Sequence, residues 1–330
     1  MKAGKLNWDD LKSIIEDSRQ VRREDVRIRS GIGEDCSVVS FGDYDCVLST
    51  DPITGAETNA GRLAVHINCN DIASSGIEPL GILVTILAPE NTSIEDIKKV
   101  MNEIKEETVK LNIEILGGHT EITKAVNKMI ISCTVIGKGE KNRAVATSGA
   151  NEGDDIVVTK LLCLEGTSII VNDYENSIKD ILTEEEITEA KEYVKYISVV
   201  KEGIVAGKLG VNSMHDITEG GVLGALWEVA EASNLGFKVY RDKMPISSIT
   251  SKICDKYSID PLRLISSGSM LITTRDGSKL VKLLQEEGIK ASIIGKITKG
   301  KGVLVNTSGV EEVVIPPERD ELFVLEEKVE

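Results

Sequence analysis

The segment that decides the fold is Asn70–Pro79, which reads NDIASSGIEP. It closes a stretch, 60–74, in which apolar residues recur at helical spacing, so we predict a helix that ends before Gly76. Asn and Asp are poor residues for a helix interior. Because Asn70 and Asp71 stand together there and small residues follow them, we infer that this end of the helix faces a site.

Two further acidic sites precede this segment, each where a loop meets an apolar run. The first is Gly31–Asp35, which precedes the predicted strand 37–41, and the second is Asp51, which closes the predicted strand 46–50. Carboxylates at such places are good ligands for hard cations such as Mg²⁺. Taken singly, the first site could be a solvated turn and Asp51 a strand terminator. Together with Asp71, they could hold metal ions against a polyphosphate.

A glycine pair supplies a candidate phosphate site later in the first half. We predict a short strand, 113–116, that leads into a loop at 117–120, Gly-Gly-His-Thr. Backbone N–H groups of a glycine pair, with a hydroxyl, can cradle a phosphate. His119 could contact that phosphate or cap the turn.

The second half repeats this arrangement. A predicted strand, 214–217, contains Asp216, and the glycines at 220–221 open a predicted helix. The N-terminus of a helix favours anions. We expect a structural role for His215, which has no ligand-like partner at metal spacing.

Composition limits the kinds of partner. The chain has 330 residues and a net charge of −15, and only 3% of its residues are aromatic. An acidic surface repels phosphate backbones, and few aromatic rings are available to stack on bases, so we expect no nucleic-acid partner. Metal ions could still screen the phosphates of a nucleotide.

The length favours two domains, and strands alternate with helices in both halves, which predicts an α/β or α+β fold. We place the boundary in the polar, glycine-containing stretch 147–154, giving domains 1–150 and 151–330. The six cysteines form no CxxC pair, which makes a structural zinc site improbable and suits reduced thiols. Cys36 could be a reactive thiol or an inert one. We find neither a signal region nor a membrane-length apolar run, so we expect a soluble, cytoplasmic protein with no membrane partner.

Taken in order, six motifs resemble the aminoimidazole ribonucleotide synthetase (PurM) superfamily, and its HypE-like branch in particular. They are GEDCS (33–37), STD (49–51), NDIASSGIEP (70–79), GGHTE (117–121), DITEGG (216–221) and SSGSM (266–270). The resemblance implies an N-terminal domain that binds ATP and pairs its sheet across a homodimer, and a C-terminal α/β domain. It also implies ATP- and Mg²⁺-dependent phosphorylation of a carbonyl, amide or phosphate acceptor, which is a small molecule or part of a protein.

Carried over by position, the resemblance also implies roles for residues. Metal binding would fall to Asp35, Asp51 and Asp71, with Glu34 in support. Nucleotide binding would involve Thr50, Asn70, Gly117, Gly118, Thr120, Gly220 and Gly221. Catalytic roles would fall to Asp71, Asp216 and His119.

Two departures from the HypE-like pattern leave the reaction open. His119 stands where many members have an acidic residue, and no cysteine follows Cys254, whereas HypE ends in the cysteine that carries the reacting group. We therefore keep hydrogenase maturation beside two alternatives. One is an accessory nucleotide-binding protein without a substrate of its own, and the other is an activity like that of thiamine-monophosphate kinase.

Overall fold

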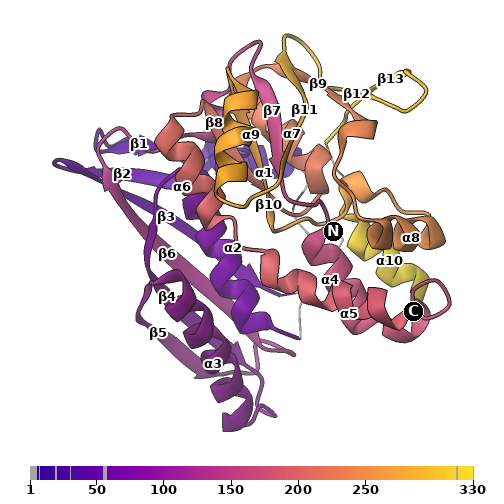
Figure 1. Ribbon diagram of the computed structural model, residues 1–330. Coiled ribbons are helices and arrows are strands. Elements are labelled where there is room, and N and C mark those ends of the chain that lie inside the picture. The colour runs from indigo at the N-terminus through magenta and orange to yellow at the C-terminus, as the bar shows by residue number, and fades with distance from the viewer. Residues whose placement is uncertain are drawn as a thin grey trace.

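Two β-sheets, one from each half of the chain, organise the structure (Figure 1). The computed structural model describes residues 6, 8–18, 21–29, 31–54, 58–316 and 319–329. Within these residues the first sheet has six strands in the order β1-β2-β3-β6-β4-β5, and the second has seven in the order β13-β12-β9-β11-β7-β10-β8. This is a mixed α/β structure, in agreement with the predicted fold class. The predicted boundary between 150 and 151 stays a prediction.

Helices α2 (Ala60–Ser74) and α3 (Ile94–Leu111) pack beside each other against the first sheet, and α2 packs on strands β3 and β6. Both helices have the bounds that the sequence predicts. Ser93 and Asp96 form a capping box at the start of α3. The strands of the first sheet are β1 (Val26–Ile28), β2 (Ser37–Phe41), β3 (Tyr44–Ile53), β4 (Pro79–Ala88), β5 (Glu114–Ile122) and β6 (Ile130–Glu140).

The second sheet is mainly antiparallel, with one parallel pair between β12 and β9. Its strands are β7 (Asp155–Thr159), β8 (Ser213–Ile217), β9 (Gly236–Tyr240), β10 (Ser269–Thr274), β11 (Ala291–Thr298), β12 (Val303–Val305) and β13 (Glu311–Val313). The remaining α-helices are α1 (Trp8–Ser18), α4 (Leu164–Asp173), α5 (Glu184–Glu192), α6 (Val200–Leu209), α7 (Gly221–Ser233), α8 (Ser248–Tyr257), α9 (Gly277–Glu286) and α10 (Glu321–Val329). We did not predict β1, α8, β12, β13 or α10, which are mostly short or lie near the C-terminus.

The predicted loop at 117–120 is wrong. These residues continue β5, which pairs in parallel with β4 as far as Ile122. Gly118 is needed for this pairing, because a Cβ there would lie 1.8 Å from the carbonyl oxygen of Val84. Gly118 is therefore explained by the close approach of two strand backbones, and we misread it as a sign of a loop.

Small residues bring the two halves into direct contact where α2 meets α6. A Cβ on Gly203 would lie 2.1 Å from the carbonyl oxygen of Ala73, and one on Gly207 would lie 2.7 Å from the Cα of Gly76. The end of α2, which carries the acidic motif, is thereby pressed against the second half. In the described parts of the chain, no helix is both long and apolar enough to cross a bilayer.

We predict that Gly203→Ala destabilises the protein by about 1–3 kcal/mol, because the added methyl group overpacks the contact with α2. An alanine in place of a helical glycine would otherwise stabilise α6 by up to about 1 kcal/mol. Denaturant unfolding measures the change, with Lys208→Ala on the exposed side of α6 as the control. Equal or higher stability of the Gly203 variant would contradict the close packing.

Candidate functional site

Asp71 stands at the centre of a buried polar cluster at the end of α2. Its carboxylate accepts a hydrogen bond from the Ser49 hydroxyl on β3, and its backbone oxygen accepts one from the Cys36 thiol at 3.0 Å. Burial raises the pKa of the Asp71 carboxyl well above its usual value. Three neighbouring carboxylates raise that pKa further, namely those of Asp216, Asp51 and Asp35. The charges of three predicted acidic residues, each from a separate segment, therefore act on the fourth, Asp71.

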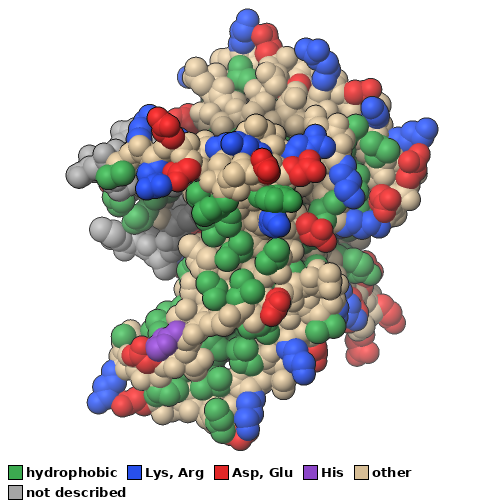
Figure 2. All heavy atoms as spheres, turned by 90° about the vertical axis from the view of Figure 1, so that its left-hand side faces the viewer, with side chains coloured by type: hydrophobic (Ala, Val, Ile, Leu, Met, Phe, Trp, Pro, Cys, Tyr) green, Lys and Arg blue, Asp and Glu red, His purple; other side chains and the backbone are tan. Residues whose placement is uncertain are grey.

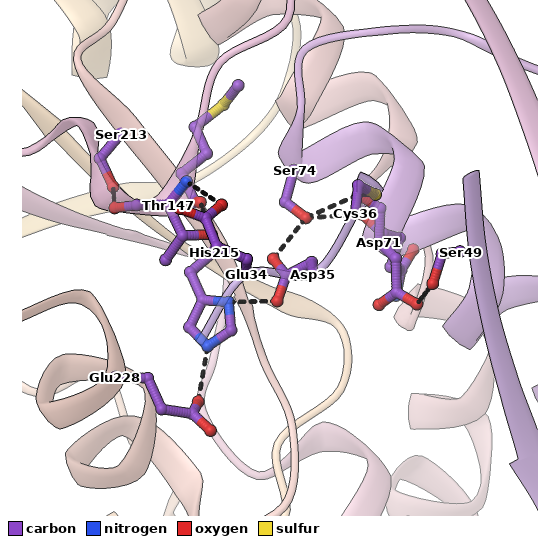
Figure 3. A network of polar contacts seen from close by, with 12 residues as sticks. Glu34, Asp35, Cys36, Ser49, Asp71, Ser74, Thr147, Ser213, His215 and Glu228 are labelled. Atoms are coloured by element: carbon purple, nitrogen blue, oxygen red, sulfur yellow. Dashed lines mark hydrogen bonds and ion pairs between the residues drawn. The ribbon is translucent and has the colours of Figure 1, made fainter. Parts of the chain in front are cut away.

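Asp35 joins the two halves of the cluster (Figure 3). One carboxylate oxygen accepts a hydrogen bond from Ser74 on α2 at 2.8 Å, and the other lies 2.6 Å from Nδ1 of His215 on β8. Nε2 of His215 lies 2.6 Å from a carboxylate oxygen of Glu228 on α7. Burial lowers the pKa of His215, but the charges and hydrogen bonds of Asp35 and Glu228 outweigh it and hold this pKa well above its usual value.

The donor atoms of this cluster suit a divalent cation. Atoms of Asp35, His215 and Asp216 lie within 4.8 Å of one another. Burial is the main cause of the raised pKa of Asp71, and repulsion from the neighbouring carboxylates, which a hard cation would relieve, raises it further. Carboxylate oxygens are the ligands that Mg²⁺ prefers, so the residues present fit such an ion. A small cavity beside the cluster is lined by Glu34, Asp35, Cys36, Asp71, Ser74 and Thr147, among others.

Glu34 and Asn70 have partners that point to structural roles. The Glu34 carboxylate accepts hydrogen bonds from the backbone N–H groups of Thr147 and Ser148, both at 3.1 Å. The Asn70 amide donates to the carbonyl of Ile197 and accepts from the N–H of Val199, both at 2.8 Å. Asn70 ties the first half to the second, and Glu34 ties its loop to the segment just before the predicted domain boundary. These contacts give both side chains a structural role, and the metal and nucleotide roles implied by resemblance stay predictions.

Thr50 and Asp51 are held in place on opposite faces of β3. The Thr50 hydroxyl donates to the carbonyl of Cys133 at 2.9 Å and accepts from Thr134 at 3.0 Å. Asn68 on α2 binds the backbone of Asp51, accepting from its N–H at 2.8 Å and donating to its carbonyl at 3.3 Å. Asn68 thus fixes the strand segment that presents the Asp51 carboxylate toward Asp71.

The residues of the GGHTE motif lie apart from this cluster, on strand β5. Register places Gly118 beside Val84, Val84 beside Cys133, and Cys133 beside Asp51, so three strand spacings separate the motif from Asp51. At about 4.8 Å a spacing, this is roughly 14 Å. His119 is 65% exposed and lies 3.5 Å from Glu121. The roles implied for Gly117, Gly118, His119 and Thr120 stay predictions.

The N-terminus of α7 already holds a carboxylate of this chain. Asp320 accepts hydrogen bonds from the backbone N–H groups of Gly220 at 2.6 Å, Leu322 at 2.8 Å and Ile265 at 3.2 Å. Burial raises the pKa of Asp320 to about 7. A Cβ on Gly221 would lie 2.6 Å from the carbonyl oxygen of Leu262, so close packing accounts for this glycine. Asp320 thus occupies the N-cap N–H of α7, and the nucleotide roles implied for Gly220 and Gly221 stay predictions.

Sequence reasoning missed the partners that hold the acidic residues. Glu228 and Asn68 gave no signal, since each lies inside a helix and outside the six motifs. His215 was expected to be structural, yet its ring contacts the cluster directly. Cys36 is buried, and burial and nearby carboxylates raise the pKa of its thiol well above its usual value, which favours the inert alternative. A neutral, enclosed thiol is a poor nucleophile.

Comparison with known proteins finds a family whose two domains both match this chain. Residues 33–138 match the N-terminal domain of the AIR synthase related proteins, and residues 151–306 match the C-terminal domain. A putative hydrogenase expression/formation protein of Methanocaldococcus jannaschii is 30% identical, over 95% of this chain and 94% of that protein. The chain belongs to the AIR synthase-related family. This membership agrees with the resemblance drawn from the six motifs.

Other members of the AIR synthase-related family are more distant. The thiamine-monophosphate kinase of Pyrococcus horikoshii is 26% identical over 83% of this chain and 85% of the kinase. HypE in its complex with HypF superposes with a TM-score of 0.78 at 22% identity, over 93% of this chain and 99% of HypE. A HypE bound to ATP gives a TM-score of 0.69 at 18% identity, over 94% and 91% of the two chains. These structures show the family fold.

We predict that Glu34→Ala lowers the free energy of unfolding by about 1–3 kcal/mol, because two backbone N–H groups lose a charged acceptor. Denaturant unfolding measures the loss. Glu78→Ala, which removes an exposed carboxylate close to the end of α2, is the matched control and should change stability little. If both variants were equally stable, Glu34 would not be the tie that its hydrogen bonds indicate.

Proposed function

We propose that this protein is an ATP- and Mg²⁺-dependent enzyme that phosphorylates an oxygen of its acceptor. The observation that carries the proposal is the gathering of Asp35, Asp51 and Asp216 around Asp71, whose pKa is raised first by burial and then by the charges of these three carboxylates. Carboxylates gathered around a buried carboxylate are costly for folding unless they serve a cation. Membership of a family whose relatives include HypE bound to ATP and a thiamine-monophosphate kinase supports the nucleotide.

Metal binding would fall to the carboxylates of Asp35, Asp51, Asp71 and Asp216. When bound, Mg²⁺ supplies positive charge that neutralises the phosphate oxygens during transfer. Phosphoryl transfer depends mainly on positioning and charge neutralisation, so the protein's part is to hold its carboxylates rigidly. Ser49 and Ser74 help to hold these carboxylates in place, because Ser49 donates a hydrogen bond to Asp71 and Ser74 donates one to Asp35.

The acceptor site would lie where the two halves meet. Asp71 and Asp35 come from the first half and Asp216 from the second, so an acceptor beside the cluster would contact both. The relative from Methanocaldococcus jannaschii bears a hydrogenase expression/formation name, which favours an amide or carbonyl acceptor in a maturation reaction. ATP turnover that rises on adding such an acceptor would support an enzyme, and no rise with any acceptor would favour an accessory role.

We predict that Asp71→Asn abolishes Mg²⁺-dependent ATP binding without unfolding the protein. The amide keeps the shape of the side chain but removes the charge that would hold the cation. Because burial and neighbouring carboxylates disfavour that charge, thermal stability should stay unchanged or rise. Calorimetric titration with ATP, with and without Mg²⁺, tests binding, and wild-type protein that binds ATP only with Mg²⁺ is the reference. Unchanged affinity of the variant would refute the role of Asp71.

We also propose that the first sheet pairs with that of a second copy. Strand alternation points Val84 and Cys133 toward α2, whereas Leu83 on β4 points to the opposite face and is 38% exposed. Leu80 and Leu116 are also exposed, at 46% and 42%. Figure 2 shows hydrophobic side chains gathered across this side of the molecule. Apolar patches of this kind mark interaction surfaces.

The dimer proposal predicts that Leu83→Glu converts the protein from a dimer to a monomer, because a charge would be buried between the sheets. Sedimentation equilibrium measures the mass. Ile94→Glu is the control, since Ile94 is 56% exposed at the start of α3, away from the proposed interface. A wild-type protein that is already monomeric at micromolar concentrations would contradict the pairing.

A further inference from the structure

Glu228 reaches the acidic cluster only through a histidine ring. It lies on α7, and its carboxylate is 2.6 Å from Nε2 of His215. On the other side of the ring, Nδ1 is 2.6 Å from the Asp35 carboxylate. The side chains of Glu228, His215 and Asp35 are 5%, 6% and 11% exposed, so bulk water has little access to the series. Figure 3 shows the three groups in a row from α7 toward α2.

We propose that Glu228 is a positioning residue that orients Asp35 through His215 and so sets the Mg²⁺ affinity of the cluster. The inference rests on the proposed function, and goes beyond it by giving the second half control over a ligand from the first. Glu228 itself would touch neither the cation nor the nucleotide.

The backbone that carries Asp35 gives the reason why such help is needed. Asp35 follows a glycine-containing loop in which Gly33 has a left-handed φ of 76°. The loop rests against α7, because a Cβ on Gly33 would lie 3.0 Å from both Cβ and the carbonyl oxygen of Glu228. Backbone contact therefore locates the loop, but it does not fix the rotation of the carboxylate beyond it.

Two side chains fix that rotation, one from each half. Ser74 on α2 binds one carboxylate oxygen of Asp35, and His215 on β8 contacts the other. The His215 ring can hold its oxygen only if its own plane is fixed, and the Glu228 bond at Nε2 fixes it. Carboxylates that orient a site through histidine typically change metal affinity 10- to 100-fold, roughly, when removed.

The chain contains a matched control for this arrangement. Glu107 on α3 lies 3.1 Å from Nε2 of His66 on α2, and both residues are buried. Glu107 also binds Arg62 and Lys110, and none of these residues contacts the acidic cluster in the described structure. Loss of Glu107 removes a buried carboxylate–histidine contact of the same kind, but leaves Asp35 untouched.

The test compares Glu228→Ala, Glu228→Gln and Glu107→Gln in the full-length protein. Calorimetry gives the Mg²⁺ concentration that supports half-maximal ATP binding, and thermal unfolding is recorded beside it. We expect Glu228→Ala to raise that concentration by about 10- to 100-fold. Glu228→Gln keeps an acceptor oxygen for Nε2–H and should restore part of the loss. Glu107→Gln should lower the unfolding temperature and leave the Mg²⁺ requirement unchanged.

A second readout separates this inference from the proposed function. Mn²⁺ prefers the same oxygen ligands and its binding is followed by electron paramagnetic resonance without ATP. Weaker Mn²⁺ binding in Glu228→Ala than in the wild type would support the positioning role even if ATP did not bind. If Glu228→Ala lost stability but bound Mn²⁺ and Mg²⁺ like the wild type, Glu228 would be structural only, and the inference would be wrong. A wild type that bound neither ion would overturn it as well.

Discussion

The constraint on which the structure depends is electrostatic: the carboxylates of Asp216, Asp51 and Asp35 act on the buried carboxylate of Asp71 where the two halves of the chain meet. Asp35, Asp51 and Asp71 come from the first half, and Asp216 comes from the second. Burial and then the neighbouring carboxylates raise the pKa of Asp71, which costs folding energy. The protein therefore needs strong contacts elsewhere to keep the halves joined.

Several of those contacts begin at the same motif that carries the acids. The Asn70 amide binds the backbone of the 197–199 segment, and Ala73 packs against Gly203. Glu34, next to Asp35, binds two N–H groups of the segment that follows β6. Asn70, Ala73 and Glu34, which lie close to the acidic residues in the sequence, thus make contacts with distant segments. The same segments therefore determine both how the halves are placed and how the carboxylates are arranged.

Two further features connect the acidic cluster to other parts of the structure. They are the open face of the first sheet and the row Glu228–His215–Asp35. A second copy on the sheet would cover the apolar face whose other side supports α2. The histidine row connects the cluster to α7, a helix that starts with Asp320 bound at its N-terminus.

The sequence by itself determined the family, the bounds of α2 and α3, and the four acidic residues, because local periodicity and short motifs carry that information. It did not determine what Glu34 and Asn70 bind, since their partners at 147–148 and 197–199 lie more than a hundred residues away. It also misread 117–120 as a loop, because a glycine needed for close strand pairing looks like one needed for a turn. Only the tertiary structure placed Glu228 behind His215, as no local pattern marks a residue that acts through another.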